Sequence, residues 1–169
     1  MRRLILFRHA KAEARAPSGE DIDRALAPAG RQDAAVMGQV LAREGLAPDL
    51  VLVSNARRTQ QTWDCLAPAF PRAKARICEA LYNASLEEIL EEVLAVAPEA
   101  TTLMVVAHNP GLHDLAVELM LDACASASEI DRVAARFPPS TACAFQMDGE
   151  GRPSPDGLFH VRDFGGDGE

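Results

Sequence analysis

The chain alternates between short unbroken runs of apolar residues and longer segments in which apolar and polar residues mix. Apolar runs at 4–7, 50–53 and 103–107 are typical of strands that are buried on both faces of a sheet. The pattern predicts strong strands over 3–7, 50–53 and 102–107, and a shorter strand over 75–78. Because such runs characterise parallel sheets, we expect a mostly parallel arrangement.

Helices are expected between these strands, and their ends carry clear signals. The pattern predicts helices over 28–44, 56–66, 85–96 and 111–122. Pro28 suits the first turn of a helix, and Gly45 suits the residue after a helix end. Ser85 followed by Glu88 matches a capping box. Strands that alternate with helices predict an α/β fold, a three-layer α/β/α sandwich with helices on both faces of a mostly parallel central sheet.

The C-terminal part of the chain has a different pattern. Segment 123–138 has the character of a short helix, and the sequence assigns it no role. Segments 141–147 and 157–162 predict a hairpin joined by a turn-rich stretch. The glycine-rich end, about 164–169, is expected to fray. The length suits one domain, 1–169, that can bury a full core without disulfides or structural metals.

Composition excludes several classes of protein. A net charge of −8 argues against binding to nucleic acid, since a protein that contacts the phosphate backbone is normally basic. Hydrophobic residues make up 48% of the chain, yet no segment approaches the length of a membrane span. The apolar run near the N-terminus is too short for a secretory signal, so we expect a cytoplasmic protein with no membrane partner.

The cysteines do not indicate a metal site. The four cysteines match no zinc-ligand spacing, and no CxxC motif occurs. We expect buried thiols in a reducing compartment, with no bound metal.

Charged and polar groups follow the strong strands. Arg8 and His9 follow the first strand, Arg58 lies just after the second, and His108 follows the last. If these strands are neighbours, their ends converge at the carboxyl edge of the sheet, where ligands bind in open α/β folds. Arg57 is expected to face solvent or an acidic partner, because adjacent helical positions do not share a face.

Such a pocket would be an anion site in an otherwise acidic protein. The helices that begin near 56 and 111 would add their N-termini to it. Arginine forks suit a phosphoryl group, and a neutral imidazole can attack phosphorus to form a phosphohistidine. No Walker motif and no acidic cluster of metal-binding spacing follow these strands, so no cofactor is expected.

Several motifs resemble those of the histidine phosphatase superfamily. Residues 8–10, Arg-His-Ala, resemble the Arg-His-Gly hallmark of that family, with alanine in place of glycine. Residues 54–62 resemble its Ser-x-x-x-Arg-[Ala/Thr]-x-x-Thr segment, and residues 106–110 resemble its second histidine-bearing strand end. The short length and residues 23–30 are similar to the small SixA-like branch of phosphohistidine phosphatases. The resemblance implies a phosphoglycerate mutase-like fold.

The resemblance also implies a role for each matching residue. It makes His9 the nucleophile and implies that Arg8, Arg58 and His108 bind the phosphoryl group. Arg24 matches a further arginine of the SixA-like branch and would contact the substrate as well.

Other residues near these motifs carry open alternatives. Ser54 is expected to cap the following helix or to hydrogen-bond the phosphate loop, and Asn109 to orient the adjacent histidine or line the pocket. Glu79 lies near the position of the proton donor in larger family members, although its neighbours do not match their pattern. The methyl group of Ala10 is expected to tighten the pocket or shift its loop.

Three functions agree with these residues. The first is a metal-independent phosphatase that acts on phosphohistidine in a signalling or phosphotransfer protein. The alternatives are a phosphatase for a small phosphorylated metabolite and a phosphate-binding regulatory module without activity. Mutase activity ranks lowest, because the chain has no room for the lid that closes the larger members' sites.

Overall fold

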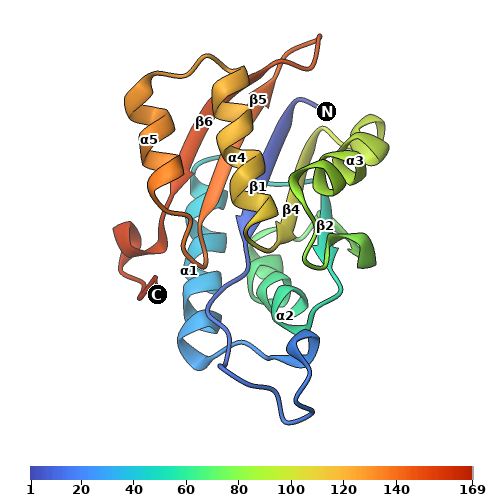
Figure 1. The fold of residues 1–169 in the computed structure, drawn as a ribbon, viewed down its shortest axis with the longest axis vertical. Coiled ribbons are helices and arrows are strands. Elements are labelled where there is room, and N and C mark those ends of the chain that lie inside the picture. The colour runs from blue at the N-terminus through green and yellow to red at the C-terminus, as the bar shows by residue number, and fades with distance from the viewer. Residues whose placement is uncertain (169) are drawn as a thin grey trace.

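The computed structural model describes residues 1–168, and its centre is one six-stranded sheet. The strands follow the order β3-β2-β4-β1-β5-β6 across the sheet (Figure 1). The first four in this order are parallel, and β5 and β6 are antiparallel to their neighbours. Their bounds are β1 Arg3–Arg8, β2 Leu50–Ser54, β3 Lys74–Cys78, β4 Thr102–Ala107, β5 Ala142–Met147 and β6 Pro153–Phe159.

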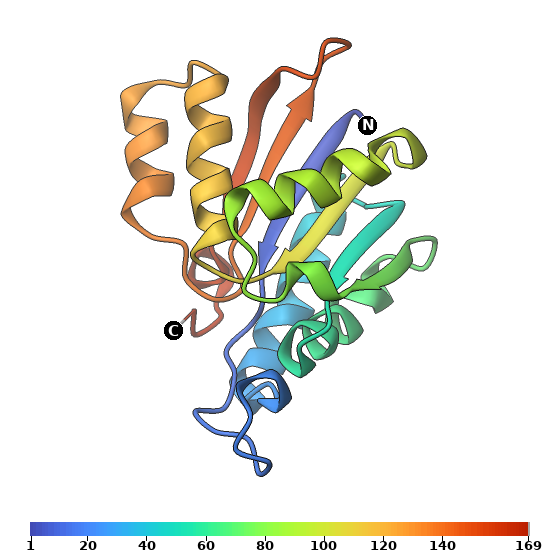
Figure 2. The ribbon, with the colours of Figure 1, turned by 45° about the vertical axis from the view of Figure 1, so that its right-hand side comes forward.

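Helices cover both faces of the sheet, which confirms the predicted three-layer sandwich (Figures 1 and 2). Helices α1 and α2 pack on one face, whereas α3 and α4 pack on the other, with α5 beside α4. The bounds are α1 Pro28–Arg43, α2 Arg57–Leu66, α3 Leu86–Val96, α4 Gly111–Asp122 and α5 Ala127–Ala135. Short 3-10 helices are η1 Asp21–Asp23, η2 Ala67–Ala69, η3 Glu79–Leu81, η4 Ala97–Glu99 and η5 Val161–Phe164.

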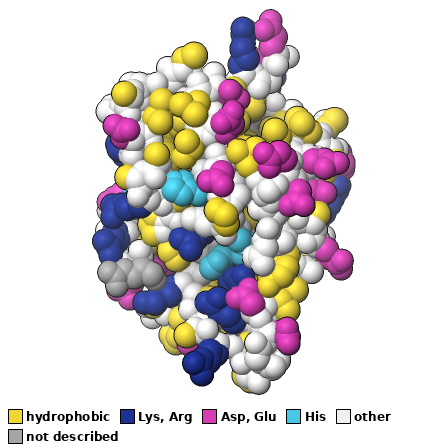
Figure 3. Space-filling view, viewed as in Figure 1, with side chains coloured by type: hydrophobic (Ala, Val, Ile, Leu, Met, Phe, Trp, Pro, Cys, Tyr) yellow, Lys and Arg dark blue, Asp and Glu magenta, His cyan; other side chains and the backbone are white. Residues whose placement is uncertain are grey.

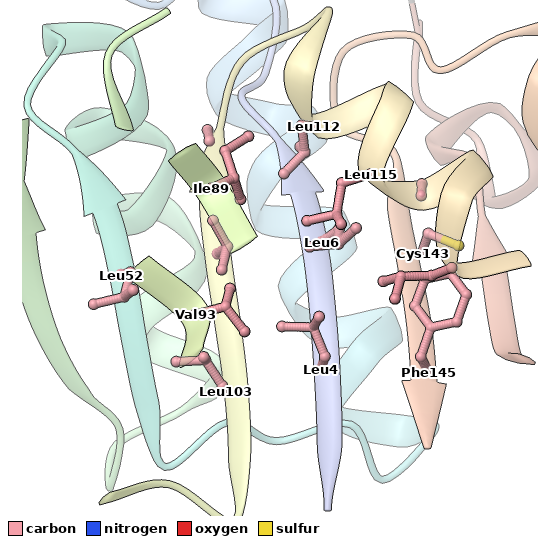
Figure 4. Packing of buried hydrophobic residues seen from close by; sticks show 14 of the residues in the cluster. Leu4, Leu6, Leu52, Ile89, Val93, Leu103, Leu112, Leu115, Cys143 and Phe145 are labelled. Carbon is pink, nitrogen blue, oxygen red and sulfur yellow. The ribbon is translucent and has the colours of Figure 1, made fainter. Parts of the chain in front are cut away.

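Alternation along each central strand divides the core into two layers. In β1, Leu4 and Leu6 point to the face covered by α3 and α4, whereas Ile5 and Phe7 point to the face covered by α1 and α2. Figure 4 shows the first layer, in which leucines of β1 face side chains from α3 and α4. Because each buried leucine or phenylalanine contributes about 1.5–3 kcal/mol, both layers strongly stabilise this arrangement.

The sheet order places the three strong strands side by side. Strand β4 lies between β1 and β2, so the carboxyl ends of all three lie at one edge of the sheet. The helices that follow β1 and β4 pack on opposite faces. Adjacent strands whose helices leave in opposite directions create a crevice between them, which is where open α/β sheets bind ligands.

The C-terminal region differs from the sequence prediction in the bounds of its last strand. The last strand is β6, Pro153–Phe159, and not 157–162, because its start contains two prolines that resemble a turn. Proline is tolerated there because β6 is the edge of the sheet. In segment 123–138 the short helix that the pattern indicates forms as α5, which begins with a capping box of Ser126 and Glu129.

Residues 167 and 168 lie against α1. The carboxylate of Asp33 accepts hydrogen bonds from the backbone N–H groups of Asp167 and Gly168, at 3.0 and 3.2 Å. These contacts belong to the segment 164–169 that was expected to fray, of which Glu169 lies outside the described residues. Within residues 1–168, no helix is both long and apolar enough to cross a membrane.

Candidate active site

The strand ends bring two histidines together. His9 follows β1 and His108 follows β4, and their ring centroids lie 5.2 Å apart. Arg58, the second residue of α2, places Nη2 3.3 Å from Nδ1 of His108. Figure 3 shows histidine, lysine and arginine side chains gathered near the centre of this face. The structure therefore forms an electropositive site at the predicted edge of the sheet.

The ring of His9 is held in one tautomer. Its Nδ1 lies 2.8 Å from the carbonyl oxygen of Ala10, and because a carbonyl can only accept, Nδ1 carries the proton. The lone pair of His9 is therefore on Nε2. Burial is the main cause that lowers the pKa of His9 to about 4, and the charges of Arg58 and Arg8 act in the same direction. His9 is consequently neutral, as a nucleophile must be, over the physiological pH range.

His108 is buried and is bonded at both ring nitrogens. Because the guanidinium of Arg58 can only donate, Nδ1 of His108 accepts, and its Nε2–H donates to Oγ of Ser54 at 2.8 Å. Burial lowers the pKa of His108 to about 3, with further contributions from His9 and Arg58. The expectation that Ser54 caps α2 is wrong, because Ala56 occupies the N-cap and no side chain bonds there.

Arg58 is fixed by the loop that follows β1. Its side chain is 5% exposed, whereas Arg57 is exposed, as the helix geometry predicts. Nη1 donates to the backbone oxygen of Asp21 at 2.8 Å, and Nη2 donates to its carboxylate at 3.0 Å. The guanidinium carbon also lies 6.0 Å from the ring centroid of Tyr82.

Arg8 is held by the segment that precedes β5. Its Nη1 donates to the backbone oxygen of Phe137 at 2.8 Å, and Nδ2 of Asn109 donates to the same oxygen at 3.0 Å. Asn109 therefore supports the segment that holds Arg8. Five buried side-chain atoms of the described residues have no hydrogen-bond partner: Arg8 Nε, Asn55 Oδ1, Arg58 Nε, Asn109 Oδ1 and Ser140 Oγ.

The buried Nε–H groups of Arg8 and Arg58 have no hydrogen-bond partner among the described residues. A buried donor without an acceptor costs about 1–3 kcal/mol, and a charged donor costs more. An anion that accepted from both arginines would remove this cost. The cationic character of the site suits a phosphoryl group, and among the described residues no group of three or more His, Cys, Asp or Glu could hold a metal ion.

Two of the predicted site residues lie farther out. Arg24 donates from Nε to the backbone oxygen of Glu13 at 2.7 Å and from Nη1 to Asp21 at 2.9 Å, with its side chain 30% exposed. It thus contacts the centre through Asp21. Glu79 is an exposed residue of η3, and its side chain has no hydrogen bond or ion pair with any described residue.

The alanine that replaces the motif glycine packs in the core. The side chain of Ala10 is fully buried and packs with Leu26 and Ala34 in a small apolar cluster. Its backbone N–H donates to Oγ1 of Thr62 at 3.0 Å. The methyl group of Ala10 thus contacts this cluster, and its effect on the pocket or on the position of the loop stays a prediction.

Sequence reasoning missed Asp21 and Tyr82. The hydroxyl of Tyr82 donates to the Asp21 carboxylate at 2.8 Å, and the Tyr82 ring packs edge-on against His108 at 5.7 Å between centroids. The available signals were an acidic residue three positions before Arg24, and a lone tyrosine shortly after a strand end. Neither signal is specific without the fold.

Comparison with known proteins agrees with this geometry. The family model for the histidine phosphatase superfamily (branch 1) matches residues 4–102, more than half of the chain. The chain belongs to this superfamily. The family match and the similar solved structures identify the protein as a phosphatase. Its relative Rv1276c of Mycobacterium tuberculosis, an uncharacterized protein, is 37% identical over 144 residues, which are 85% of this chain and 88% of that protein.

Two solved structures are similar over most of the chain. The candidate phosphohistidine phosphatase SixA from Agrobacterium tumefaciens has a TM-score of 0.81 and 28% identity, and the alignment covers 94% of this chain and 97% of that one. The corresponding SixA candidate from Nakamurella multipartitia has a TM-score of 0.81 and 32% identity, with 94% and 95% of the two chains covered. The histidine phosphatase resembles SixA proteins throughout the fold.

Proposed function

We propose that this histidine phosphatase hydrolyses phosphohistidine and uses His9 as its nucleophile. The observation that carries the proposal is the unbonded Nε2 of His9, whose ring lies 5.2 Å from that of His108, together with the buried, unpartnered Nε–H groups of Arg8 and Arg58. A phosphoryl group that accepts from both arginines would be held beside a neutral imidazole.

In the first step, Nε2 of His9 attacks phosphorus in line. A P–N bond to His9 forms as the P–N bond of the substrate breaks, and the leaving imidazole takes a proton from solvent. Charge on the equatorial oxygens is stabilised by the donors of Arg8 and Arg58. The His9 ring becomes more positive during attack, and the Ala10 carbonyl that accepts from Nδ1 stabilises that charge.

In the second step, water attacks phosphorus and the bond to His9 breaks. Inorganic phosphate forms, a proton passes to solvent, and the neutral imidazole is restored. When the leaving group is an imidazole, the first step does not need Glu79 as an acid. The P–N bond of a phosphoramidate breaks with less help from a proton donor than the P–O bond of an alcohol ester. The exposed position of Glu79 is therefore in accord with a phosphohistidine substrate.

The similarity to SixA candidates over 94% of the chain supports a phosphohistidine-bearing protein of signalling or phosphotransfer as the substrate. Partly exposed Arg24 and Asp21 form the mouth of the site, which suits a side chain presented by another protein. The cysteines, all four unpaired, support a reducing compartment such as the cytoplasm.

The test is phosphate release from a phosphohistidine-bearing protein and from p-nitrophenyl phosphate, in the presence of EDTA. Wild type should release phosphate and form an acid-labile phosphoenzyme, and His9→Asn should do neither. Faster turnover of p-nitrophenyl phosphate or sugar phosphates would point to a small metabolite instead. Activity of His9→Asn within about tenfold of wild type would reject His9 as the nucleophile.

A further inference from the structure

The carboxylate of Asp21 is the most highly connected group at the mouth of the pocket, and no step of the proposed reaction uses it. Its Oδ2 accepts from Nη2 of Arg58 at 3.0 Å and from the Tyr82 hydroxyl at 2.8 Å. Its Oδ1 accepts from Nη1 of Arg24 at 2.9 Å. Three residues that are far apart in the sequence therefore meet on one carboxylate.

The hydrogen bonds from Arg58 to Asp21 use the two terminal nitrogens of its guanidinium and leave Nε–H unbonded. Asp21 bonds the outer end of the guanidinium, with its backbone oxygen on Nη1 and its carboxylate on Nη2. The second hydrogen of Nη2 is directed to His108. Nε–H has no partner, although it is buried. Asp21 thus fixes the orientation of the guanidinium through Nη1 and Nη2 and leaves Nε–H unbonded.

The charge of Asp21 persists at working pH. The pKa of its carboxyl lies well below the usual range, first because of the hydrogen bond from Arg24 and then because of those from Tyr82 and Arg58. A fixed anion next to a phosphate site has two opposite effects, since it repels the substrate but also orients the arginines. Because Asp21 bonds Nη1 and Nη2 of Arg58 and leaves Nε–H unbonded, we expect that orienting Arg58 outweighs repelling the substrate.

We propose that Asp21 is a positioning residue that holds Arg58, Arg24 and Tyr82 in one arrangement around the phosphoryl site. The inference deepens the proposed function and rests on it for the kinetic part of the test. Because Asp21 acts through these three side chains, its loss should harm the transition state more than the bound ground state. A displacement of about 1 Å in a positioned group can lower the reaction rate about 100-fold.

Asp21→Asn is the test, and Asp23→Asn is its matched control. Both residues lie in η1 and each substitution removes one negative charge, but within residues 1–168 the carboxylate of Asp23 accepts only from the hydroxyl of Ser18. We expect Asp21→Asn to lower kcat for p-nitrophenyl phosphate by about tenfold or more, with KM changed by less than about threefold. Affinity for vanadate, measured by calorimetry, should fall by a factor similar to kcat. Asp23→Asn should stay within about twofold of wild type.

A second variant isolates one of the bonds. Tyr82→Phe removes only the hydroxyl that donates to Asp21, so it should shift kcat and vanadate affinity in the same direction by a smaller factor. Its effect should be largely lost in the Asp21→Asn background, because the two substitutions then remove the same contact.

Two results would overturn the inference. Equal losses in Asp21→Asn and Asp23→Asn would show a general effect of charge or loop stability. Tighter vanadate binding by Asp21→Asn with kcat unchanged would show that the carboxylate merely competes with the anion. If wild type turned over no phosphoryl substrate, the proposed function would fail, whereas the vanadate affinities would still decide the role of Asp21.

Discussion

The Nε2–H of His108 donates a hydrogen bond to Oγ of Ser54 at 2.8 Å, which links the end of β4 to the end of β2. Both side chains are buried, so this bond is shielded from water. With Nε2 bonded to Ser54, Nδ1 of His108 is free to accept from Arg58. Arg58 sets the tautomer of His108, because its guanidinium can only donate, and Ser54 accepts the Nε2–H that this tautomer carries.

The first prediction concerns this bond. Ser54→Ala should lower the free energy of unfolding by about 1–3 kcal/mol, because Nε2–H of His108 would be left buried without an acceptor. Urea denaturation measures this loss. Ser140→Ala is the matched control, since it also removes a buried hydroxyl, but one without a partner. Equal losses in the two variants would contradict the importance of the bond to His108.

The second prediction compares two adjacent arginines. Arg58→Ala should reduce kcat/KM by about 100-fold to 1000-fold, as expected when a preorganised donor to a transition state is removed. Arg57→Ala removes the same charge from an exposed neighbour and should change kcat/KM by about twofold at most. Steady-state kinetics at several salt concentrations would separate a specific effect of Arg58 from a general effect of charge. Similar losses of kcat/KM in the two variants would reject a specific role for Arg58.

The third prediction follows from the lowered pKa values of the two histidines. Burial lowers the pKa of His9 to about 4 and that of His108 to about 3, against an ordinary value of 6.5. Between pH 6.5 and pH 4 the unfolded chain therefore binds more protons than the folded chain. The free energy of unfolding should fall as the pH drops through this range.

Ring resonances in NMR titrations provide the direct measurement. The His9 signal, assigned by its loss in His9→Asn, should titrate below pH 5, and the fall in stability with acid should be shallower in that variant. A midpoint of His9 near 6.5 in the folded protein would contradict the burial described for its ring.

The fourth prediction tests how the first loop is held. Gly30 lies in the first turn of α1, where a side chain would overlap the backbone carbonyl of Lys11. Gly30→Ala should therefore cost about 1–3 kcal/mol of stability and should lower activity, since Lys11 is next to Ala10 and its site loop. Gly149→Ala, at a position with open space, should change stability by about 0.5 kcal/mol or less. Comparable changes in the two variants would count against the close packing at Gly30.

The sequence was informative where one local pattern dominates. The central strands are unbroken apolar runs because both faces of the sheet are covered, and such runs are visible without knowledge of their neighbours. The capping box at Ser85 and Glu88 forms as predicted, since it depends on four consecutive residues. Edge strand β6 was misplaced because its prolines are acceptable only at the edge of a sheet, and an edge is a property of the whole fold.

The sequence by itself determined the sandwich, the strand ends and the residues that follow them, because these depend on periodicity and on groups adjacent in the chain. Tertiary structure alone decided which partners those residues have. Tyr82 and Asp21 are 61 positions apart, and their bond exists because the turn after β3 meets the loop after β1. The placement of Ser54 against His108 likewise depends on β2 pairing with β4. Hydrogen bonds act over about 3 Å, so only the folded chain specifies them.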